Sequence, residues 1–372
     1  MVLLLASLQT FGQNRLEFDG QFSAFGNYSP DNELDVELGA RYIPELEYSI
    51  PLDSTSNIDF QVSANLDANS AFSPFYKSKE DGNIDPYRIW ARYSTEQFEL
   101  RAGLQKIDFG SATMLRPLQW FNQIDPRDPL ALTNGVYGLL SRYYFTNNAN
   151  VWGWVLYGNE KTRGFDAVPT YEKRPEYGGR IQYPVPKGEL ALSYHHRTAN
   201  STSLAFPEVL PFEQIAEDKF GIDGKWDVEV GLWFEATYSH KSEDIGILTN
   251  QTLMNFGVDY TFGIGSGLGI IVEHLITSYD EKAFQFAENR HITALNSTYP
   301  ITMNDNLSAV IYYDWSTNDQ TFFLNYQHQF ANLTGYLMAY YNPETQQGIQ
   351  QNELTNNNNT GPSFRVMLVY NH

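Results

Sequence analysis

The chain has 372 residues, a formal net charge of −20 and no cysteine. The absence of thiols excludes disulfides, a thiolate nucleophile and cysteine-ligated metals, and the negative charge argues against a nucleic-acid partner. Tyrosine (25) and phenylalanine (24) are abundant, yet no apolar run reaches the ~20 residues of a spanning helix. This pattern is typical of a transmembrane β-barrel, whose side chains alternate between lipid and lumen. A soluble β-sandwich or propeller is the alternative.

Residues 1–12 have the pattern of a secretory signal peptide. Val2–Leu8 is a short apolar run, and Thr10 and Gly12 supply small residues near a cleavage position. No basic stretch precedes the run, which a truncated start would explain. We expect residues 13–372 to form a single barrel domain.

Alternation of apolar and polar side chains predicts about 18 antiparallel strands. The clearest is 34–50, where apolar residues at most even positions alternate with mainly charged residues at odd positions. The count falls to 16 if 219–227 or 291–301 is not a strand. In chain order the predicted strands are 15–26, 34–50, 58–68, 86–94, 98–107, 135–146, 150–158, 176–184, 189–198, 219–227, 230–240, 251–262, 267–277, 291–301, 307–315, 321–330, 333–341 and 362–371.

The connections between these strands alternate in length. Short turns are followed by longer connections at 69–84, 108–134, 159–175, 199–218, 241–250, 279–290 and 342–361. Outer-membrane barrels have short periplasmic turns, long extracellular loops and an even strand count, so both termini are predicted on the periplasmic side. The last ten residues, SFRVMLVYNH, alternate strictly and resemble the insertion signal of such barrels, although His372 replaces the usual terminal phenylalanine.

The same alternation predicts which side chains line the lumen. The first three strands contribute an acidic and amide set: Glu17, Asp19, Gln21, Asp35, Glu37, Asp59, Asn65 and Asp67. The next strands contribute a mainly basic set: Arg88, Arg92, Arg101, Gln105, Arg142 and Arg180. A barrel this wide leaves a lumen, and opposed charged walls would place a transverse field across it. The alternative is that these charges pair with one another and only satisfy the wall.

Alternation stops between Gly103 and Gly135, where aromatic residues, prolines and opposed charges are packed together. A long ordered connection in an otherwise regular all-β chain is usually functional. We expect 108–134 to fold into the barrel and narrow it, with Trp120 and Phe121 packed on the wall. Its charged residues would border the passage: Asp108, Arg116, Asp125, Arg127 and Asp128. The alternative is an external cap packed on neighbouring loops.

The stretches GLQKIDFG (103–110) and WFNQIDPRDP (120–129) resemble the strand and inward loop of substrate-specific porins. The alginate-export-like outer-membrane proteins, which are 18-stranded barrels, are the most similar, and the phosphate-selective porins are more distant. Those families often carry Gly-Arg-Gln and a Trp-Gly pair where this chain has Leu104 and Phe109. The resemblance implies the fold and does not imply a substrate.

The sequence shows no pattern of an enzyme or cofactor site. The seven histidines are scattered and none lies in a Gly-x-Ser-x-Gly context. A P-loop, a metal-ligand spacing and a dinucleotide fingerprint are also missing from the sequence. We therefore expect no catalytic activity, metal or cofactor. Paired carboxylates on facing strands at the rim are the enzymatic alternative.

The predicted function is passive diffusion of small hydrophilic solutes, including anions, through a channel in the outer membrane of a Gram-negative bacterium. Expected partners are the solute and the outer-membrane lipid, including lipopolysaccharide, and the barrel is expected to be a monomer or a homotrimer. The alternative from another class is a non-conducting barrel that anchors or stabilises a surface complex. It predicts a lumen blocked by 108–134.

Overall fold

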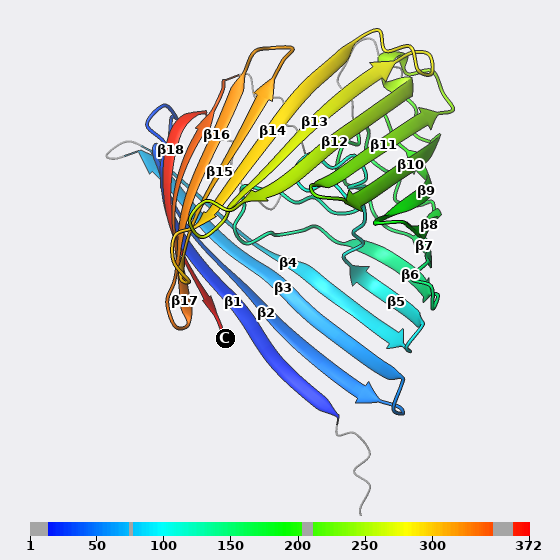
Figure 1. Cartoon of the computed structure of the whole chain (residues 1–372), viewed down its shortest axis with the longest axis horizontal. Helices are drawn as coiled ribbons and strands as arrows, with labels where there is room; N and C mark the ends of the chain where they lie inside the picture. The colour runs from blue at the N-terminus through cyan, green and yellow to red at the C-terminus, as the bar shows by residue number, and fades with distance from the viewer. Residues whose placement is uncertain (1–13, 74–76, 203–210, 345–359) are drawn as a thin grey trace, which may run out of the picture.

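The computed structural model describes residues 14–73, 77–202, 211–344 and 360–372. They form one antiparallel sheet of 18 strands that closes on itself (Figure 1). The strands are β1 Arg15–Tyr28, β2 Val36–Pro51, β3 Asn57–Ser73, β4 Lys77–Ser94, β5 Phe98–Gln105, β6 Val136–Tyr144, β7 Asn150–Leu156, β8 Glu176–Val185, β9 Gly188–Ala199, β10 Ile215–Asp227, β11 Gly231–Lys241, β12 Asn250–Phe262, β13 Leu268–Asp280, β14 Asn289–Pro300, β15 Asp305–Asp314, β16 Gln320–Gln329, β17 Leu333–Asn342 and β18 Gly361–Asn371.

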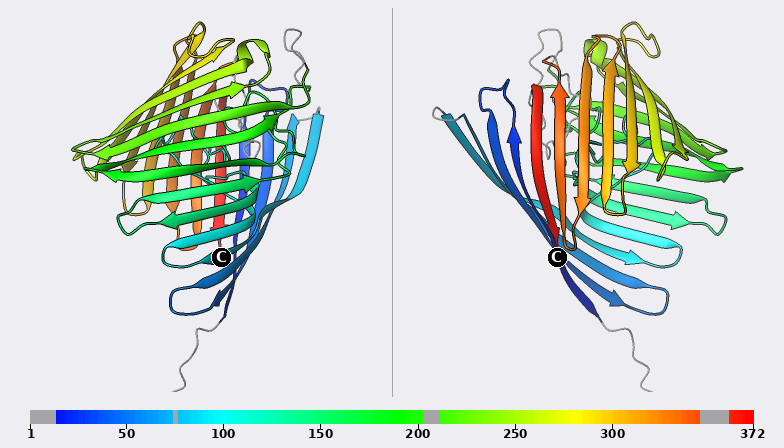
Figure 2. Two further views of the ribbon diagram at one scale, coloured as in Figure 1. Left: turned by 90° about the vertical axis from the view of Figure 1, so that its right-hand side faces the viewer. Right: turned by 60° about the vertical axis from the view of Figure 1, so that its left-hand side comes forward.

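Consecutive strands pair along the chain, and the seam between the first and last strands closes the barrel. β1 pairs with β2 on one side and with β18 on the other, from Gln21 opposite Asn371 to Tyr28 opposite Phe364. Closure removes the open sheet edges that a spanning structure cannot leave unpaired in lipid. β1 begins and β18 ends at the same end of the barrel (Figure 2). The expected strand number and up-and-down order are confirmed.

Large apolar side chains cover the outside of the barrel. Leu192, Phe220 and Phe364 are 61%, 52% and 58% exposed, and they alternate with buried or half-buried neighbours along their strands. Because side chains point to opposite faces at successive positions, the outward positions form an apolar surface and the inward positions line the lumen. The chain is an all-β transmembrane barrel. Among the described residues, no helix is long and apolar enough to span a membrane.

The predicted connection at 69–84 is wrong, because β3 and β4 continue through most of it. β3 runs to Ser73 and β4 starts at Lys77, with Asp67 opposite Asn83, and the register shifts between Ser63 and Ala64. The residues in this hairpin are mainly polar, so the alternation of apolar and polar residues could not reveal the two strands. A hairpin that extends beyond the membrane needs no apolar face. β10 likewise begins at Ile215, four residues before the predicted start. The expected signal peptide and most of the 342–361 connection lie outside the described residues.

Candidate functional site

The inner wall divides into sectors of different chemistry. β1 to β6 and β8 to β12 carry charged side chains, whereas β13 to β18 carry an apolar set at mid-height: Leu275, Ile292, Val310, Tyr312, Phe323, Met338 and Met367. These apolar side chains are 6% exposed or less. Since apolar surface facing a water-filled lumen is unfavourable, other parts of the chain must cover them.

The segment 106–135, between β5 and β6, lies inside the barrel and supplies part of that cover (Figure 1). Two glycines with positive φ angles set its course. Gly103 has a φ of 123°, and an added Cβ would lie 2.1 Å from the Ile89 carbonyl oxygen; Gly110 has a φ of 104°, and a Cβ would lie 2.3 Å from Glu235 Oε1. Both positions are restricted to glycine by backbone conformation and by space.

Two inward carboxylates bind the backbone of this segment. Glu273 on β13 accepts hydrogen bonds from the backbone N–H groups of Thr113, Met114 and Leu115 at 2.7, 3.1 and 2.6 Å. The Thr113 hydroxyl (2.9 Å) and the Trp233 indole N–H (3.2 Å) donate to the same carboxylate. Five donors on one buried carboxylate make a strong anchor, because hydrogen bonds to an ionised acceptor are about twice as strong as neutral ones.

Glu235 on β11 is the second anchor. Its carboxylate accepts hydrogen bonds from the backbone N–H groups of Ala112 at 2.8 Å and Leu118 at 3.1 Å. Glu235 therefore holds both ends of the short stretch 112–118 against β11, and Glu273 on β13 holds its middle. The alternation pattern places Glu235 and Glu273 inward but carries no signal that they bind a loop, so sequence reasoning missed them.

Apolar and aromatic side chains complete the packing of the segment. Phe109 stacks on Trp154 with ring centroids 5.6 Å apart, and Phe121 meets Trp154 and His195 edge-on at 5.3 and 4.9 Å. Trp120 stacks on His195 at 6.0 Å. Met114 and Leu115 pack into the apolar sector of β13 to β18. Aromatic pairs of this geometry add to the stabilisation from buried area.

Lys106, Asp108 and Arg116 form an ionic group within the segment. Asp108 accepts from Arg116 at 2.6 Å and from Lys106 at 3.2 Å. Burial raises the pKa of Asp108, but the two cations outweigh this effect and hold the pKa below its ordinary value.

Asp125, Arg127 and Asp128 order the second half of the segment. Arg127 binds Asp125 at 3.0 Å and the Asn342 side-chain oxygen on β17 at 3.0 Å. Asp128 accepts from the backbone N–H groups of Leu130 and Leu132, both at 3.0 Å, and burial raises its pKa above the ordinary value. Together with Asp108 and Arg116, these are the five charged residues that the sequence singled out here.

The predicted wall residues fall into two groups. Arg92 binds Asp59 at 2.9 Å, and Arg101 and Arg142 share Glu99 at 3.1 and 3.6 Å. Trp90 lies under the Arg101 guanidinium at 4.6 Å and Trp152 under that of Arg142 at 4.0 Å. These five charged groups lie together on β3 to β6.

The remaining residues of the mainly basic set, Arg88, Gln105 and Arg180, are buried. Arg88 donates to the carbonyl and hydroxyl oxygens of Thr133 at 2.9 and 2.5 Å. Gln105 donates to the carbonyl oxygens of Arg101 and Gly138. Arg180 forms a double hydrogen bond with Asp223 at 2.6 and 2.8 Å. Arg88 therefore holds the end of the inward segment, while Arg180 lies apart from the β3 to β6 cluster.

A second inward segment, 157–175 between β7 and β8, was expected only as an external connection. Thr170 forms a bridge with Ala199, and the Tyr171 N–H donates to the Thr198 carbonyl, so this part of the segment runs beside β9. Val168 is fully buried. The segment also contacts β12, where the Gln251 side chain donates to the Phe165 carbonyl oxygen at 2.8 Å, so it packs on the inner face of β9 to β12.

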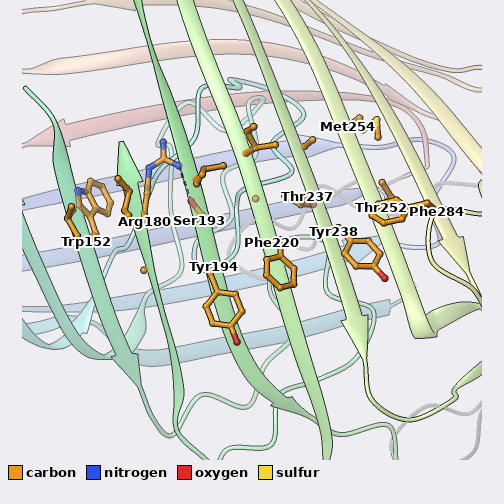
Figure 3. Close-up of a pocket in the computed structure, with 17 residues that line it drawn as sticks. Trp152, Arg180, Ser193, Tyr194, Phe220, Thr237, Tyr238, Thr252, Met254 and Phe284 are labelled. Carbon is orange, nitrogen blue, oxygen red and sulfur yellow. Dashed lines mark hydrogen bonds between the residues drawn. The ribbon is translucent and has the colours of Figure 1, made fainter. Parts of the chain in front are cut away.

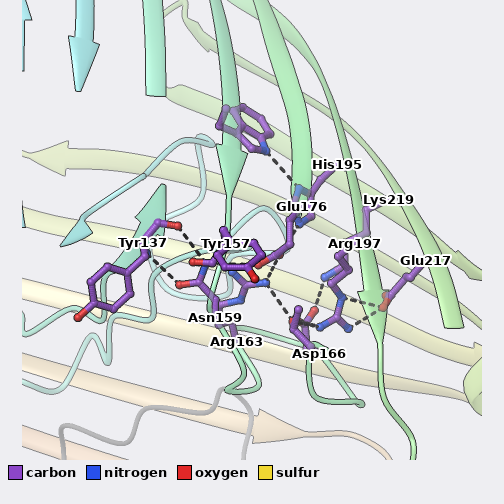
Figure 4. Close-up of polar contacts among 12 residues, drawn as sticks. Tyr137, Tyr157, Asn159, Arg163, Asp166, Glu176, His195, Arg197, Glu217 and Lys219 are labelled. Carbon is purple, nitrogen blue, oxygen red and sulfur yellow. Dashed lines mark hydrogen bonds and ion pairs between the residues drawn. The ribbon is translucent and has the colours of Figure 1, made fainter. Parts of the chain in front are cut away.

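Buried ion pairs fix this second segment (Figure 4). Asp166 binds Arg197 on β9 at 2.9 Å and Lys219 on β10, and Arg197 also binds Glu217 at 2.6 Å. Arg163 binds Glu176 at 2.5 Å. All these side chains are 5% exposed or less. Breaking one partner of such a network leaves an uncompensated buried charge.

The accessible part of the lumen lies on the opposite side, against β1 to β6. The Glu17 and Arg92 side chains are 34% and 32% exposed, and Asp19 is exposed, whereas Arg197, Glu217 and Lys241 on β9 to β11 are 2% exposed or less. The two inward segments therefore fill one side of the barrel and leave solvent-exposed charged residues on the other.

Comparisons with known proteins place this fold. No family model and no curated protein matches the sequence. The structure is similar to OccK5 (OpdH) of Pseudomonas aeruginosa, with a TM-score of 0.58 at 11% identity over 96% of this chain and 97% of that chain. It is similar to OccAB1 of Acinetobacter baumannii, with a TM-score of 0.56 at 10% identity over 96% of each chain. OmpT of Vibrio cholerae, an outer membrane protein solved in trimer form, gives 0.51 at 9% identity over 97% of this chain and all of that chain.

The chain has the porin-like fold of outer-membrane β-barrels. Identities this low show the fold alone. The apolar outer surface and the closed barrel agree with an outer-membrane location.

Proposed function

We propose that the chain is an outer-membrane channel through which small hydrophilic solutes diffuse passively. The observation that carries this proposal is the asymmetry of the lumen: Glu17, Asp19 and Arg92, on β1 and β4, stay partly or fully exposed, while 106–135 and 157–175 pack mainly against the other walls. The passage would run between the inward segment and the β1 to β6 wall. A channel narrowed on one side by a fixed loop restricts solutes by size and charge without moving parts.

We further propose a mild preference for anionic or polar solutes at the cluster on β3 to β6. Its three arginines outnumber its two carboxylates, Asp59 and Glu99, which leaves a local net charge of +1. The acidic side chains of β1 and β2 face the passage beside it. This arrangement supports the predicted transverse field, in which paired and exposed charges coexist.

Planar bilayers with the purified, folded barrel test this proposal. We expect stepwise conductance in KCl, and uptake of small sugars and anions in a liposome-swelling assay. Folded barrel that inserts but neither conducts nor passes sugars would contradict the channel.

The non-conducting barrel is the second candidate, and the density of the inward packing favours it. Leu115, Trp120 and Phe121 are 5% exposed or less, so the segment seals the part of the lumen that it occupies. Replacing 111–132 by a short Gly-Ser linker separates the two candidates. A silent wild-type barrel that conducts after this replacement would identify a plugged barrel, whereas a conducting wild type supports the channel.

A further inference from the structure

The outer face of β7 to β12 carries an apolar groove of about 790 Å³, which is within the size range of small-molecule sites. Leu192, Ile222 and Met254 lie along it. Gly179 and Ala236 leave the groove hollow, because they place little or no side chain at outward positions between larger neighbours. Leu192 and Ile222 are 61% and 41% exposed and belong to the outward set, so the groove opens to the surroundings of the barrel.

Aromatic side chains form the margin of the groove on the side of the loop between β13 and β14. Figure 3 shows Tyr194, Phe220 and Tyr238 in a row across neighbouring strands, with Phe284 beside Tyr238. The Tyr238 and Phe284 rings stack with centroids 4.5 Å apart. Phe284 belongs to the loop 281–288 and has a φ of 56°, a conformation that is uncommon for phenylalanine. The loop therefore bends to hold this ring over the outside of β11.

A carboxylate lies directly beyond this margin. Asp218 accepts hydrogen bonds from the Tyr194 hydroxyl at 2.7 Å and from His196 Nδ1 at 2.8 Å, and its side chain remains 40% exposed. On the outward faces of β8 to β12, all within the described residues, Asp218 is the one carboxylate, and no lysine or arginine is present there. Charged side chains on the lipid face are costly and mark functional positions.

An apolar groove that ends at a single exposed carboxylate is suited to an amphiphile with an apolar chain and a cationic head group. The groove would hold an acyl chain, and the carboxylate would accept hydrogen bonds from a cationic head group. A primary ammonium offers three N–H donors, a quaternary ammonium offers none, and a phosphate without an amine would be repelled by Asp218.

We propose that this surface is a binding site for a lipid whose head group carries a primary ammonium, with one acyl chain in the groove and the ammonium on Asp218. The site requires only that the barrel lies in a bilayer, so the lipid-binding proposal does not depend on whether the barrel conducts.

Photolabelling of the full chain in phosphatidylcholine vesicles tests the site. The probes are trace phosphatidylethanolamine and trace phosphatidylcholine, each with a diazirine in an acyl chain, and labelled positions are mapped by mass spectrometry. We expect phosphatidylethanolamine to label Leu192, Ile222 and Met254 in preference to outward residues elsewhere, and unlabelled phosphatidylethanolamine to compete better than phosphatidylcholine.

Matched variants separate the groove from the carboxylate. Ala236→Trp fills the groove and should reduce labelling severalfold, whereas Val366→Trp, at a 55% exposed outward position on β18, should not. Asp218→Asn should lower the preference for phosphatidylethanolamine by about threefold, as expected for a partly exposed ionic contact, and leave acyl labelling of the groove in place. Heat-dependent electrophoretic migration checks that each variant is folded.

Three results would overturn the proposal. They are labelling spread evenly around the barrel, equal labelling by the two lipids in the wild type, and crosslinks from the groove to a second copy of the barrel in place of lipid.

Discussion

On β3 and β4, Arg92 pairs with Asp59 and keeps 32% of its side chain exposed; on β9 and β10, Arg197 is fully buried between Asp166 and Glu217. The residue types are the same, but the inward segments cover only the second pair. Removing one partner of a fully buried pair leaves an uncompensated buried charge, which is costly, whereas a pair whose arginine is partly exposed contributes less to stability and leaves that arginine available to solutes. Burial, more than residue type, decides which charges are structural and which are available to the passage.

The largest expected effect comes from detaching the inward segment. Glu273→Ala removes the acceptor of five hydrogen bonds and leaves buried N–H groups unsatisfied, at a cost of more than about 3 kcal/mol. We expect a larger and noisier single-channel conductance and a lower free energy of unfolding. Glu17→Ala, at a 34% exposed side chain on β1, is the control and should change stability little. Unchanged conductance and stability in Glu273→Ala would contradict the anchor.

The second test compares the two kinds of arginine directly. Arg197→Ala should lower the free energy of unfolding by about 3 to 5 kcal/mol, because Asp166 and Glu217 would remain charged and buried. Arg92→Ala should cost about 1 kcal/mol or less. Urea unfolding followed by tryptophan fluorescence measures both. Equal losses would remove the distinction between the two walls.

A charge reversal on the accessible wall should change selectivity with the fold intact. Arg92→Glu combined with Arg101→Glu converts the +1 cluster into an acidic one, so the reversal potential in a KCl gradient should shift toward cation preference. Lys187→Glu, a reversal in an exposed turn between β8 and β9, is the matched control. If selectivity is unchanged, the arginine cluster does not act on ions, although the channel could still conduct.

The smallest effect is a pH dependence of the inward segment. The pKa of Asp108 is lowered in the folded chain, so its pairing with Arg116 contributes stability above the ordinary carboxyl pKa of ~3.9. That contribution is lost as the pH falls through the lowered pKa. Protonation of Asp108 should therefore make the conductance noisier only in acid below the ordinary carboxyl pKa. If Asp108→Asn shows the same increase of conductance noise in acid, the increase is caused by another titratable group.

Alternation predicted the strand number, the up-and-down order and the lumen-facing parity, because a lipid-facing surface imposes apolar residues such as Phe18 and Leu192 at the outward positions, which are every second residue of a strand. Alternation did not predict the β3–β4 hairpin, because its residues do not face lipid and need not be apolar. It also could not identify Glu235 and Glu273 as anchors or Arg163 and Asp166 as inward. Periodicity assigns each side chain to the inner or outer face, but the partners that it contacts across the lumen depend on how distant strands are arranged around the barrel. The sequence of one strand does not contain that information.

The break in alternation located the segment after Gly103, and its aromatic content indicated packing. Its actual partners could not be predicted. Phe121 and Trp120 pack on His195 of β9, which no sequence pattern connects with this segment.

The partners of 106–135 also bear on the order in which the barrel assembles. Its contacts run from Arg88 on β4 to Asn342 on β17, and its apolar cluster extends to Val369 on β18. Such long-range contacts form late, because the intervening chain must first be ordered. The segment therefore lacks its full set of partners until the last strands arrive, and it must already lie within the curved sheet when β18 joins β1. A chain truncated before β17 would leave this segment, and not only a sheet edge, exposed to chaperones and proteases.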